Sequence, residues 1–325
     1  MVRAIRVHER GGPEVLRWDE VEAPEPGKGE VRLKHVAIGL NYIDTYVRSG
    51  LYPVPSLPCG LGTEASGAVE AVGQGVTNLK PGDRVAYAGG PLGAYAEART
   101  MPADVLVKLP ESIDDTTAAG TMLQGLTVQY LIRQTFPVEP GMTVLFHAAA
   151  GGVGLIACQW LRHLGVTVIG TVGSDEKADL ARSNGCHHPI LYTEENFVDR
   201  VREITAGEGV PVVYDSVGKD TFEGSLDCLA RRGMMVSFGN ASGKAPPIEP
   251  LTLNQKGSLY LTRPKLGDYA STRAELEAMA DDLFGVLGSG AVHANVRQRY
   301  ALQDAAQAHR DLEARRTTGS TVLIP

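Results

Sequence analysis

The sequence predicts an α/β protein in which a doubly wound parallel sheet is accompanied by a second, β-rich domain. Its 325 residues are too many for one ordinary core, which favours two domains. A strand, a glycine-rich turn, a helix and a second strand follow one another over residues 143–172. The pattern of predicted elements also changes near residue 123, from short strands and turns to alternating strands and helices.

The first 120 residues contain short apolar runs separated by Gly- and Pro-containing turns, such as Lys80-Pro-Gly-Asp83 and Gly89-Gly-Pro91. This pattern is typical of a barrel or a sandwich. We expect strands at Ala4–His8, Val31–Ile38, Ala68–Val72, Arg84–Ala88, Ala94–Thr100 and Val105–Lys108.

From residue 123 to 262 strands and helices alternate, as they do in a Rossmann sheet with right-handed crossovers. The expected strands are Val144–Phe146, Val166–Val172, Pro189–Tyr192, Val210–Asp215, Met234–Phe238 and Ser258–Thr262. The expected helices are Val153–Leu164, Phe197–Ala206 and Thr221–Arg231.

Beyond residue 263 the alternation stops. Helices are expected at Thr272–Leu287 and Gln303–Glu313, and strands at Arg297–Tyr300 and Thr321–Ile324. We expect this tail to return to the first domain. The predicted division is therefore 1–122 with 263–325 for the β-rich domain and 123–262 for the nucleotide-binding domain.

Composition excludes several classes of protein. The formal net charge is −7, which gives no electrostatic reason to expect a nucleic acid or an anionic membrane as a partner. No apolar run approaches the roughly 20 residues that span a bilayer, and the first residues lack a secretory signal. The four cysteines are far apart and have neither zinc-site nor disulfide-framework spacing. A cytoplasmic location is expected.

The glycine turn at residues 151–154 predicts a dinucleotide site, because glycines let a backbone approach a pyrophosphate at a helix N-terminus. NAD-binding sheets usually carry an acidic residue at the end of the second strand. Here Val172 or Gly173 stands at that position, followed by Ser174 and Lys177, which favours the 2′-phosphate of NADP. Asp175 and Glu176 oppose this interpretation unless they point into solvent.

Distinctive stretches occur from Gly11 to Pro325, namely Gly11–Leu16, Ala37–Tyr46, Arg48–Tyr52, Gly60–Glu64, Phe146–Gly154, Val213–Gly218, Ser237–Asn240 and Leu253–Ser258. Together they resemble the quinone oxidoreductases of the medium-chain dehydrogenase/reductase superfamily, specifically the bacterial NADPH:quinone reductase type related to zeta-crystallin. The resemblance implies a GroES-like fold for the β-rich catalytic domain. It also implies a homodimer that pairs the Ser258–Thr262 edge strands.

The resemblance further implies how the chain would hold NADPH. The pyrophosphate would lie at Ala150, Gly151, Gly152 and Val153, and the 2′-phosphate at Gly173, Ser174, Lys177, Tyr192 and Arg315. Ser216, Phe238, Gly239 and Asn240 would line the nicotinamide half, with Tyr42, Ile43 and Thr127, next to Asn41 and Asp44, on the opposite wall. Arg263, Pro264 and Lys265 would follow the last sheet strand into the same cleft.

Related zinc alcohol dehydrogenases carry a Cys and a Gly-His-Glu motif as metal ligands. The matching positions here are Asn41 and Gly62-Thr63-Glu64, so the thiolate and the imidazole are missing and no metal is expected. Without a Lewis acid to acidify a hydroxyl, alcohol oxidation is disfavoured. Hydride transfer from NADPH to an electron-poor quinone needs less assistance.

The negative charge that develops on the acceptor oxygen requires a hydrogen-bond donor. Tyr46, Tyr52, Asn41 and Arg263 are the candidates, with Asp44 positioning its neighbours. Packing remains the alternative for both tyrosines, and for His147 packing near the cofactor is favoured over a role as a base.

Two other functions are compatible with parts of the sequence. An alkenal or enone reductase would use the same hydride donor, and acceptor choice cannot be inferred from the chain. A crystallin-like structural or RNA-binding role is the other alternative, which the acidic balance disfavours.

Overall fold

The computed structural model describes all residues from Met1 to Pro325 and divides them into two compact units. The first contains Met1–Leu126, Ala270–Gly288 and Ala294–Pro325, and the second contains Thr127–Tyr269 and Ser289–His293. Three separate stretches of chain therefore build the first unit. No helix is long and apolar enough to cross a membrane.

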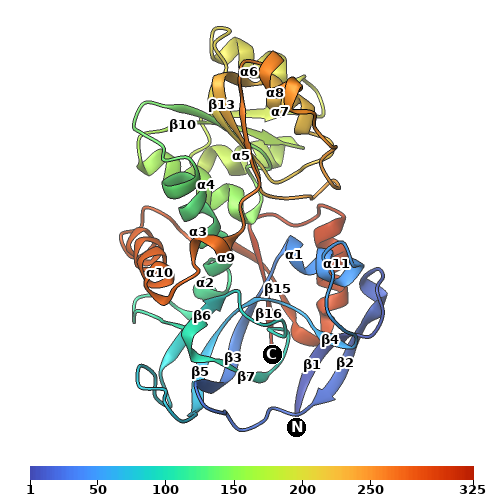
Figure 1. Cartoon of the computed structure of the whole chain (residues 1–325), viewed down its shortest axis with the longest axis vertical. Helices are drawn as coiled ribbons and strands as arrows, with labels where there is room; N and C mark the ends of the chain where they lie inside the picture. The colour runs from blue at the N-terminus through green and yellow to red at the C-terminus, as the bar shows by residue number, and fades with distance from the viewer. The chain divides into compact units, whose positions relative to one another are not determined.

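A six-stranded parallel sheet in the order β11-β10-β9-β12-β13-β14 is the centre of the second unit (Figure 1). The chain reverses its direction of winding between the neighbours β9 and β12, which is where such sheets bind their ligands. The strands are β9 Thr143–Phe146, β10 Thr167–Val172, β11 His188–Leu191, β12 Val210–Asp215, β13 Leu229–Ser237 and β14 Tyr260–Thr262. The expected Rossmann sheet is confirmed.

Helices of this unit pack in pairs. α4 (Gly152–His163) contacts α5 (Asp175–Ser183), and α6 (Phe197–Ile204) contacts α7 (Phe222–Asp227). Side chains of α6 and α7 join those of the strands in one buried apolar cluster that contains Ile169, Val213 and Phe222. The remaining helices are α8 Pro250–Gln255 and α9 Leu266–Tyr269, and α3 (Met122–Tyr130) begins in the first unit.

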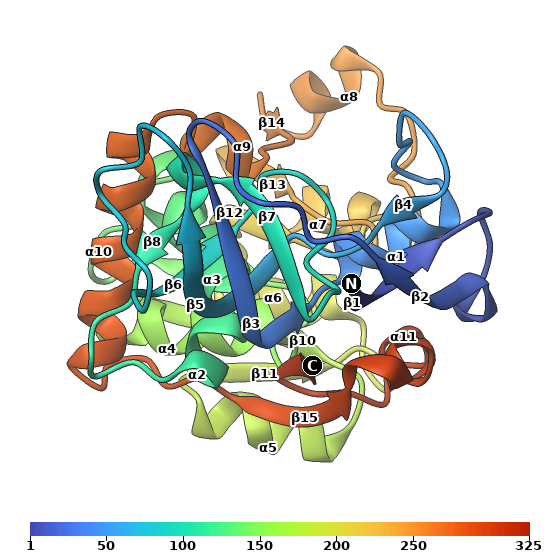
Figure 2. The same cartoon turned by 90° about the horizontal axis from the view of Figure 1, so that it is seen from below.

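The first unit is built around β3 (Glu30–Leu40), which at 11 residues is its longest strand. β3 pairs antiparallel with β5, β7 and β16. Figure 2 shows β3 between β5 and β7. The larger sheet has the order β15-β16-β3-β5-β6-β8, and a smaller one has the order β2-β1-β4. The expected β-rich domain is confirmed. Its strands are β1 Val2–Val7, β2 Leu16–Val21, β4 Cys59–Gly60, β5 Glu64–Val72, β6 Arg84–Ala88, β7 Ala98–Pro102, β8 Val107–Lys108, β15 Val296–Ala301 and β16 Ser320–Ile324.

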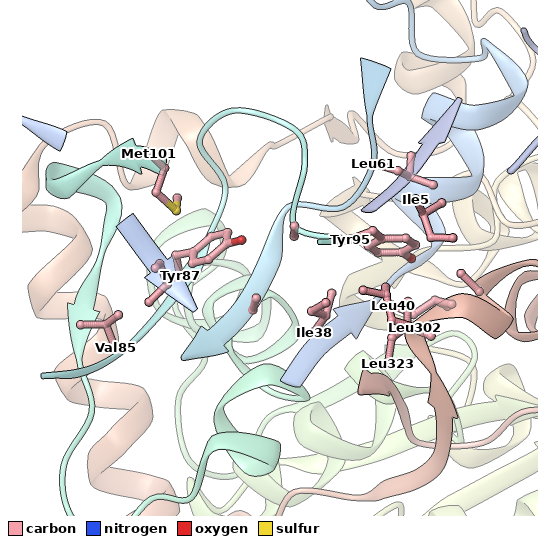
Figure 3. Close-up of a cluster of buried hydrophobic side chains, with 14 of the residues drawn as sticks. Ile5, Ile38, Leu40, Leu61, Val85, Tyr87, Tyr95, Met101, Leu302 and Leu323 are labelled. Carbon is pink, nitrogen blue, oxygen red and sulfur yellow. The ribbon is translucent and has the colours of Figure 1, made fainter. Parts of the chain in front are cut away.

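Apolar side chains from both sheets form the core of this unit, as Figure 3 shows for residues from Ile5 to Leu323. Tyr95 lies among them and is fully buried, although its hydroxyl is polar. The helices around this core are α1 Tyr42–Ser49, α2 Asp115–Ala119, α10 Arg273–Gly288 and α11 Ala305–Glu313. A buried hydroxyl needs a hydrogen-bond partner, which for Tyr95 comes from α1 and α11.

Some expected elements have other boundaries. The edge strand expected at Ser258–Thr262 begins only at Tyr260, because Ser258 has a left-handed backbone with φ 58°. The helix expected at Thr221–Arg231 ends at Asp227, since β13 already begins at Leu229. The strand expected from Ala94 begins at Ala98.

Candidate functional site

The glycine turn after β9 leads directly into α4, whose N-cap is Gly151. A Cβ atom at Gly154 would lie 2.3 Å from the Ala148 carbonyl oxygen, so this turn tolerates no side chain there. No side chain caps α4. The N–H groups of its first turn, near Gly152 and Val153, are therefore not capped by a side chain, as in helix N-termini that bind anions.

The end of β10 carries the residues expected around a 2′-phosphate. Val172 is buried and no carboxylate follows it directly, and a Cβ at Gly173 would lie 2.7 Å from the Tyr192 hydroxyl. Ser174 is the N-cap of α5 and accepts from the Lys177 backbone N–H at 3.4 Å. Gly173, Ser174 and Tyr192 therefore meet in a corner at the end of β10, where a side chain at position 173 would come too close to the Tyr192 hydroxyl.

Two carboxylates, Asp175 and Glu176, follow this corner in the chain and would repel a 2′-phosphate if they faced it. Asp175 and Glu176 are exposed in the first turn of α5, whereas Lys177 is half-buried. Water screens exposed carboxylates, and at the helix N-terminus they are favoured by the helix dipole. This objection to NADP is therefore weakened by the geometry.

The loops that follow β12 and β13 contact each other. A Cβ at Gly239 would lie 2.2 Å from the Ser216 carbonyl oxygen, so the two loops are in close contact. Arg263 Nη1 donates to the carbonyls of Ser237 at 2.8 Å and Gly239 at 3.2 Å. In the amide orientation that satisfies its neighbours, Asn240 accepts from Arg263 Nη2 at 3.0 Å.

Arg263 thereby holds the Phe238–Asn240 loop in place through its guanidinium. The Phe238 ring lies 5.8 Å from the ring of Phe146 at the end of β9. Lys265, by contrast, is exposed and forms an ion pair with Asp268 at 3.2 Å.

In the first unit, Asn41 is the N-cap of α1 and the centre of a polar chain. Its side-chain Nδ2 donates to Glu64 at 2.6 Å, and Glu64 also accepts from the Leu123 N–H at 2.6 Å. Gln124 donates to the Asn41 side-chain oxygen at 3.2 Å and itself accepts from Ser320 at 2.7 Å. Burial raises the pKa of Glu64 to about 8, against the effect of these donors.

Asp44 closes a capping box with Asn41, because its carboxylate accepts from the Asn41 backbone N–H at 2.9 Å. The same carboxylate oxygen accepts from the Tyr95 hydroxyl at 2.9 Å. Asp44 is only 1% exposed, and burial raises its pKa to about 7. Asp44 therefore joins the N-terminus of α1 to Tyr95.

Below Tyr95 the network continues to a buried arginine. Tyr95 lies 3.2 Å from His309 Nε2, and Arg48 Nη1 donates to His309 Nδ1 at 2.9 Å. Arg48 also donates to the Gly11 carbonyl and forms an ion pair with Glu313 at 2.6 Å. Since arginine only donates, His309 must carry its proton on Nε2, and Tyr95 must then donate to Asp44.

Tyrosines gather on and next to α1. The ring of Tyr46 meets the ring of Tyr52 edge-on at 5.3 Å, and Tyr42 lies 6.4 Å from Tyr46. The Tyr42 hydroxyl donates to the Leu312 carbonyl, which ties α1 to α11. Tyr46 is 9% exposed, whereas Tyr52 is half-buried, so Tyr52 is the more accessible of the two proton-donor candidates.

Comparisons with known proteins find two family models along the chain. The family model described as "Alcohol dehydrogenase GroES-like domain" matches residues 27–111, and the one described as "Zinc-binding dehydrogenase" matches residues 152–282. A quinone oxidoreductase of Pseudomonas aeruginosa is 58% identical over the full length of both chains. The chain belongs to the quinone oxidoreductase family. The expected resemblance is thus confirmed.

Other members of the superfamily are similar in structure as well. The crystal structure of the Escherichia coli quinone oxidoreductase, complexed with NADPH, has a TM-score of 0.98 at 53% identity and covers 99% of this chain and 100% of its own. A 2-haloacrylate reductase of a Burkholderia species is 49% identical over 100% of this chain and 99% of its own. Two acceptor chemistries are therefore represented among proteins similar to this quinone oxidoreductase family member.

The predicted site residues are divided between the two units. The nucleotide unit contains the residues from Thr127 to Lys265, and the GroES-like unit contains Asn41–Asp44, Tyr46, Tyr52 and Arg315. No group of three His, Cys, Asp or Glu side chains is arranged to hold a metal ion.

Sequence reasoning missed the residues that hold Asn41 and Asp44 in place. Four of them lie far from α1 in the chain: Gln124, Ser320, Tyr95 and His309. The fifth, Arg48, lies in α1 but belongs to no motif that indicates this role. The Asn41–Asp44 spacing was the one available signal, since a capping box has an acceptor three residues after its N-cap.

Proposed function

We propose that this quinone oxidoreductase family member transfers a hydride from NADPH to a quinone, without a catalytic zinc ion. The single observation that carries the cofactor assignment is the corner at the end of β10, where Gly173, Ser174 and Tyr192 stand in place of a carboxylate. The names of the full-length relatives support a quinone as the acceptor.

The residues present fit a dinucleotide. Gly154 and Gly239 let the backbone pack closely at these turns, because a Cβ would lie 2.3 Å and 2.2 Å from a carbonyl oxygen, and the uncapped N-terminus of α4 suits a pyrophosphate. Lys177 supplies positive charge for a 2′-phosphate. When bound, NADPH supplies a hydride, and the protein supplies binding, orientation and electrostatics.

On the acceptor side, the proposal assigns hydrogen-bond donation to Tyr52, Tyr46 and the Asn41 amide. One Asn41 N–H already donates to Glu64, and Gln124 occupies the Asn41 oxygen. In this arrangement the second N–H of the Asn41 amide is the donor assigned to the acceptor oxygen, which gains negative charge.

The side chains at the positions of the dehydrogenase zinc ligands support the metal-independent assignment. Asn41 replaces a thiolate, Thr63 replaces an imidazole, and Glu64 uses both carboxylate oxygens for Asn41 and Leu123. Zinc sites in proteins are built from Cys, His and carboxylate ligands, usually at least three.

The test is a matrix of NADPH and NADH against 1,4-benzoquinone, an α,β-unsaturated ketone and 2-chloroacrylate, with chelator-treated protein. We expect NADPH with the quinone to give the highest kcat/KM. A highest value with 2-chloroacrylate or the ketone would instead support the activity of the haloacrylate or enone type. Failure to bind NADPH, together with a salt-sensitive shift of RNA, would support the crystallin-like alternative.

We further propose that the chain forms a homodimer through β14 and works in the cytoplasm. β14 is the last strand of its sheet, and its Tyr260 and Leu261 are 59% and 36% exposed. An edge strand offers unpaired backbone groups to a second copy. Light scattering should give twice the mass of the chain, and Leu261→Lys should reduce it to one chain.

A further inference from the structure

A buried chain of hydrogen bonds runs beneath the glycine turn of the nucleotide unit. His147 directly follows β9, and its Nδ1 lies 2.9 Å from the Thr171 hydroxyl of β10. Its Nε2 lies 2.9 Å from the Ser225 hydroxyl of α7. Ser225 in turn reaches Asp215, at the end of β12, at 3.0 Å. This chain of hydrogen bonds therefore connects β9, β10, β12 and α7 at the carboxyl ends of the strands, where such sheets bind nucleotides.

Asp215 accepts four hydrogen bonds, so both oxygens of this fully buried side chain have partners. One oxygen accepts from the backbone N–H groups of Val217 and Gly218, at 2.7 and 3.0 Å. The other accepts from the hydroxyls of Thr221 and Ser225, at 2.7 and 3.0 Å. Asp215 therefore fixes the loop that starts with Ser216, which in turn contacts Gly239.

The direction of the chain follows from this carboxylate. Because Ser225 donates its only proton to Asp215, its oxygen must accept from His147, which places the imidazole proton on Nε2. The unprotonated Nδ1 then accepts from Thr171. The Thr171 oxygen can also accept from the Ala148 backbone N–H, at 3.3 Å. Each hydrogen bond between Ala148 and Asp215 therefore has one defined donor and one defined acceptor.

Because this chain of hydrogen bonds is buried, its polar groups must find their partners within the protein. His147, Ser225 and Asp215 are 0% exposed, and Phe197 packs edge-on against the imidazole at 5.1 Å. Burial lowers the pKa of His147, which keeps the ring neutral with both nitrogens in use. A group in this state has no free nitrogen to act as a base. It can, however, transmit the position of one loop to another.

We propose that His147 is a positioning residue that couples the glycine turn to the Ser216–Gly218 loop and so holds both in the conformation that binds the dinucleotide. Ala148, the first residue of the turn, has a left-handed backbone with φ 55°, a conformation that a non-glycine residue adopts at a cost. The hydrogen bond from its N–H to Thr171 helps to hold it there. This inference rests on the proposed NADPH-binding function.

Two measurements on the protein without cofactor test the coupling. Nitrogen-15 NMR of the imidazoles should show His147 as the neutral Nε2–H tautomer at pH 7, and an Nδ1–H tautomer or a charged ring would overturn the assignment. Amide exchange should report the loops. Thr171→Val should speed exchange at Val217 as well as at Ala148, whereas an effect confined to Ala148 would show that the two loops are not coupled.

Fluorescence titration with NADPH supplies the binding readout. Thr171→Val and Ser225→Ala each remove two hydrogen bonds of this chain and should each weaken binding by about threefold to tenfold. Thr171→Ser, which retains the hydroxyl, should bind as the wild type does. Thr205→Val is the matched control, because this hydroxyl bonds within α6 and at its C-terminal end, away from the chain.

The outcomes separate the inference from the proposed function. Wild-type protein that fails to bind NADPH would refute the proposed function. Wild-type protein that binds, with Thr171→Val and Ser225→Ala binding equally well, would refute the coupling alone. The double variant should lose less affinity than the sum of the two single losses in free energy, because both act through His147.

Discussion

Glu64→Gln is the substitution that most directly tests the buried polar chain around Asn41. Burial raises the pKa of Glu64 from 4.5 to about 8 in the folded protein. A shift of this size corresponds to about 5 kcal/mol between the two protonation states, at 1.36 kcal/mol per pKa unit. The folded state binds this proton more tightly than the unfolded state. The contribution is therefore fully present below pH 4.5 and is lost as the pH rises through 8.

Glutamine removes the ionisation and keeps the shape. Its Nε2 can donate to the Asn41 oxygen if the amides of Asn41 and Gln124 both reverse, and the Ser320 hydroxyl can then accept from Gln124. No buried polar atom is left without a partner in that arrangement. We therefore expect similar stability of variant and wild type at pH 5, and a more stable variant at pH 9, by up to about 5 kcal/mol.

Urea denaturation followed by far-UV circular dichroism at pH 5, 7 and 9 measures this difference. Glu9→Gln, at an exposed position of the same unit, is the matched control and should leave the pH dependence unchanged. A stability difference between Glu64→Gln and the wild type that stays constant from pH 5 to 9 would refute the reasoning. Asp44, whose pKa burial raises to about 7, contributes a dependence of the same sign in both proteins.

Four further predictions concern other parts of the chain. Gly154→Ala should abolish NADPH binding, because the new Cβ would lie 2.3 Å from a carbonyl oxygen, whereas Gly285→Ala, with open space around it, should bind normally. Arg48→Met should cost about 3–5 kcal/mol in urea denaturation, since Arg48 is 2% exposed and its ionic and hydrogen-bonding partners would remain; a loss below 1 kcal/mol would contradict this. Lys177→Ala should raise the KM for NADPH about tenfold and leave that for NADH unchanged. Tyr52→Phe should lower kcat with 1,4-benzoquinone by at least about tenfold, and unchanged turnover in this variant and in Tyr46→Phe would exclude tyrosine as the donor.

The nucleotide unit could be predicted from the sequence because its signals are local. Apolar runs of strand length, the glycine turn and helical spacing occur within short windows, and they gave the Rossmann sheet correctly. Two expected boundaries in this unit were wrong: β14 begins at Tyr260 because Ser258 has a left-handed backbone, and α7 ends at Asp227 because β13 begins at Leu229.

The buried polar networks could not be predicted, because they join residues far apart in the chain. Arg48 and His309 are separated by 261 positions, and Asn41 and Gln124 by 83. The direction of each network also depends on which side chains lose contact with water. Composition carries no such information. His147 was interpreted as a packing residue, and the structure adds that both of its ring nitrogens are bonded.

The central claim, hydride transfer from NADPH to a quinone without zinc, is tested most directly by one measurement. Protein dialysed against a strong chelator, with zinc content verified by elemental analysis, is assayed for NADPH oxidation with 1,4-benzoquinone. The account predicts full activity at less than about one-hundredth of a zinc ion per chain, with a slower rate when the transferred hydrogen of NADPH is deuterium. Activity that disappears with zinc and returns on its addition would contradict the account.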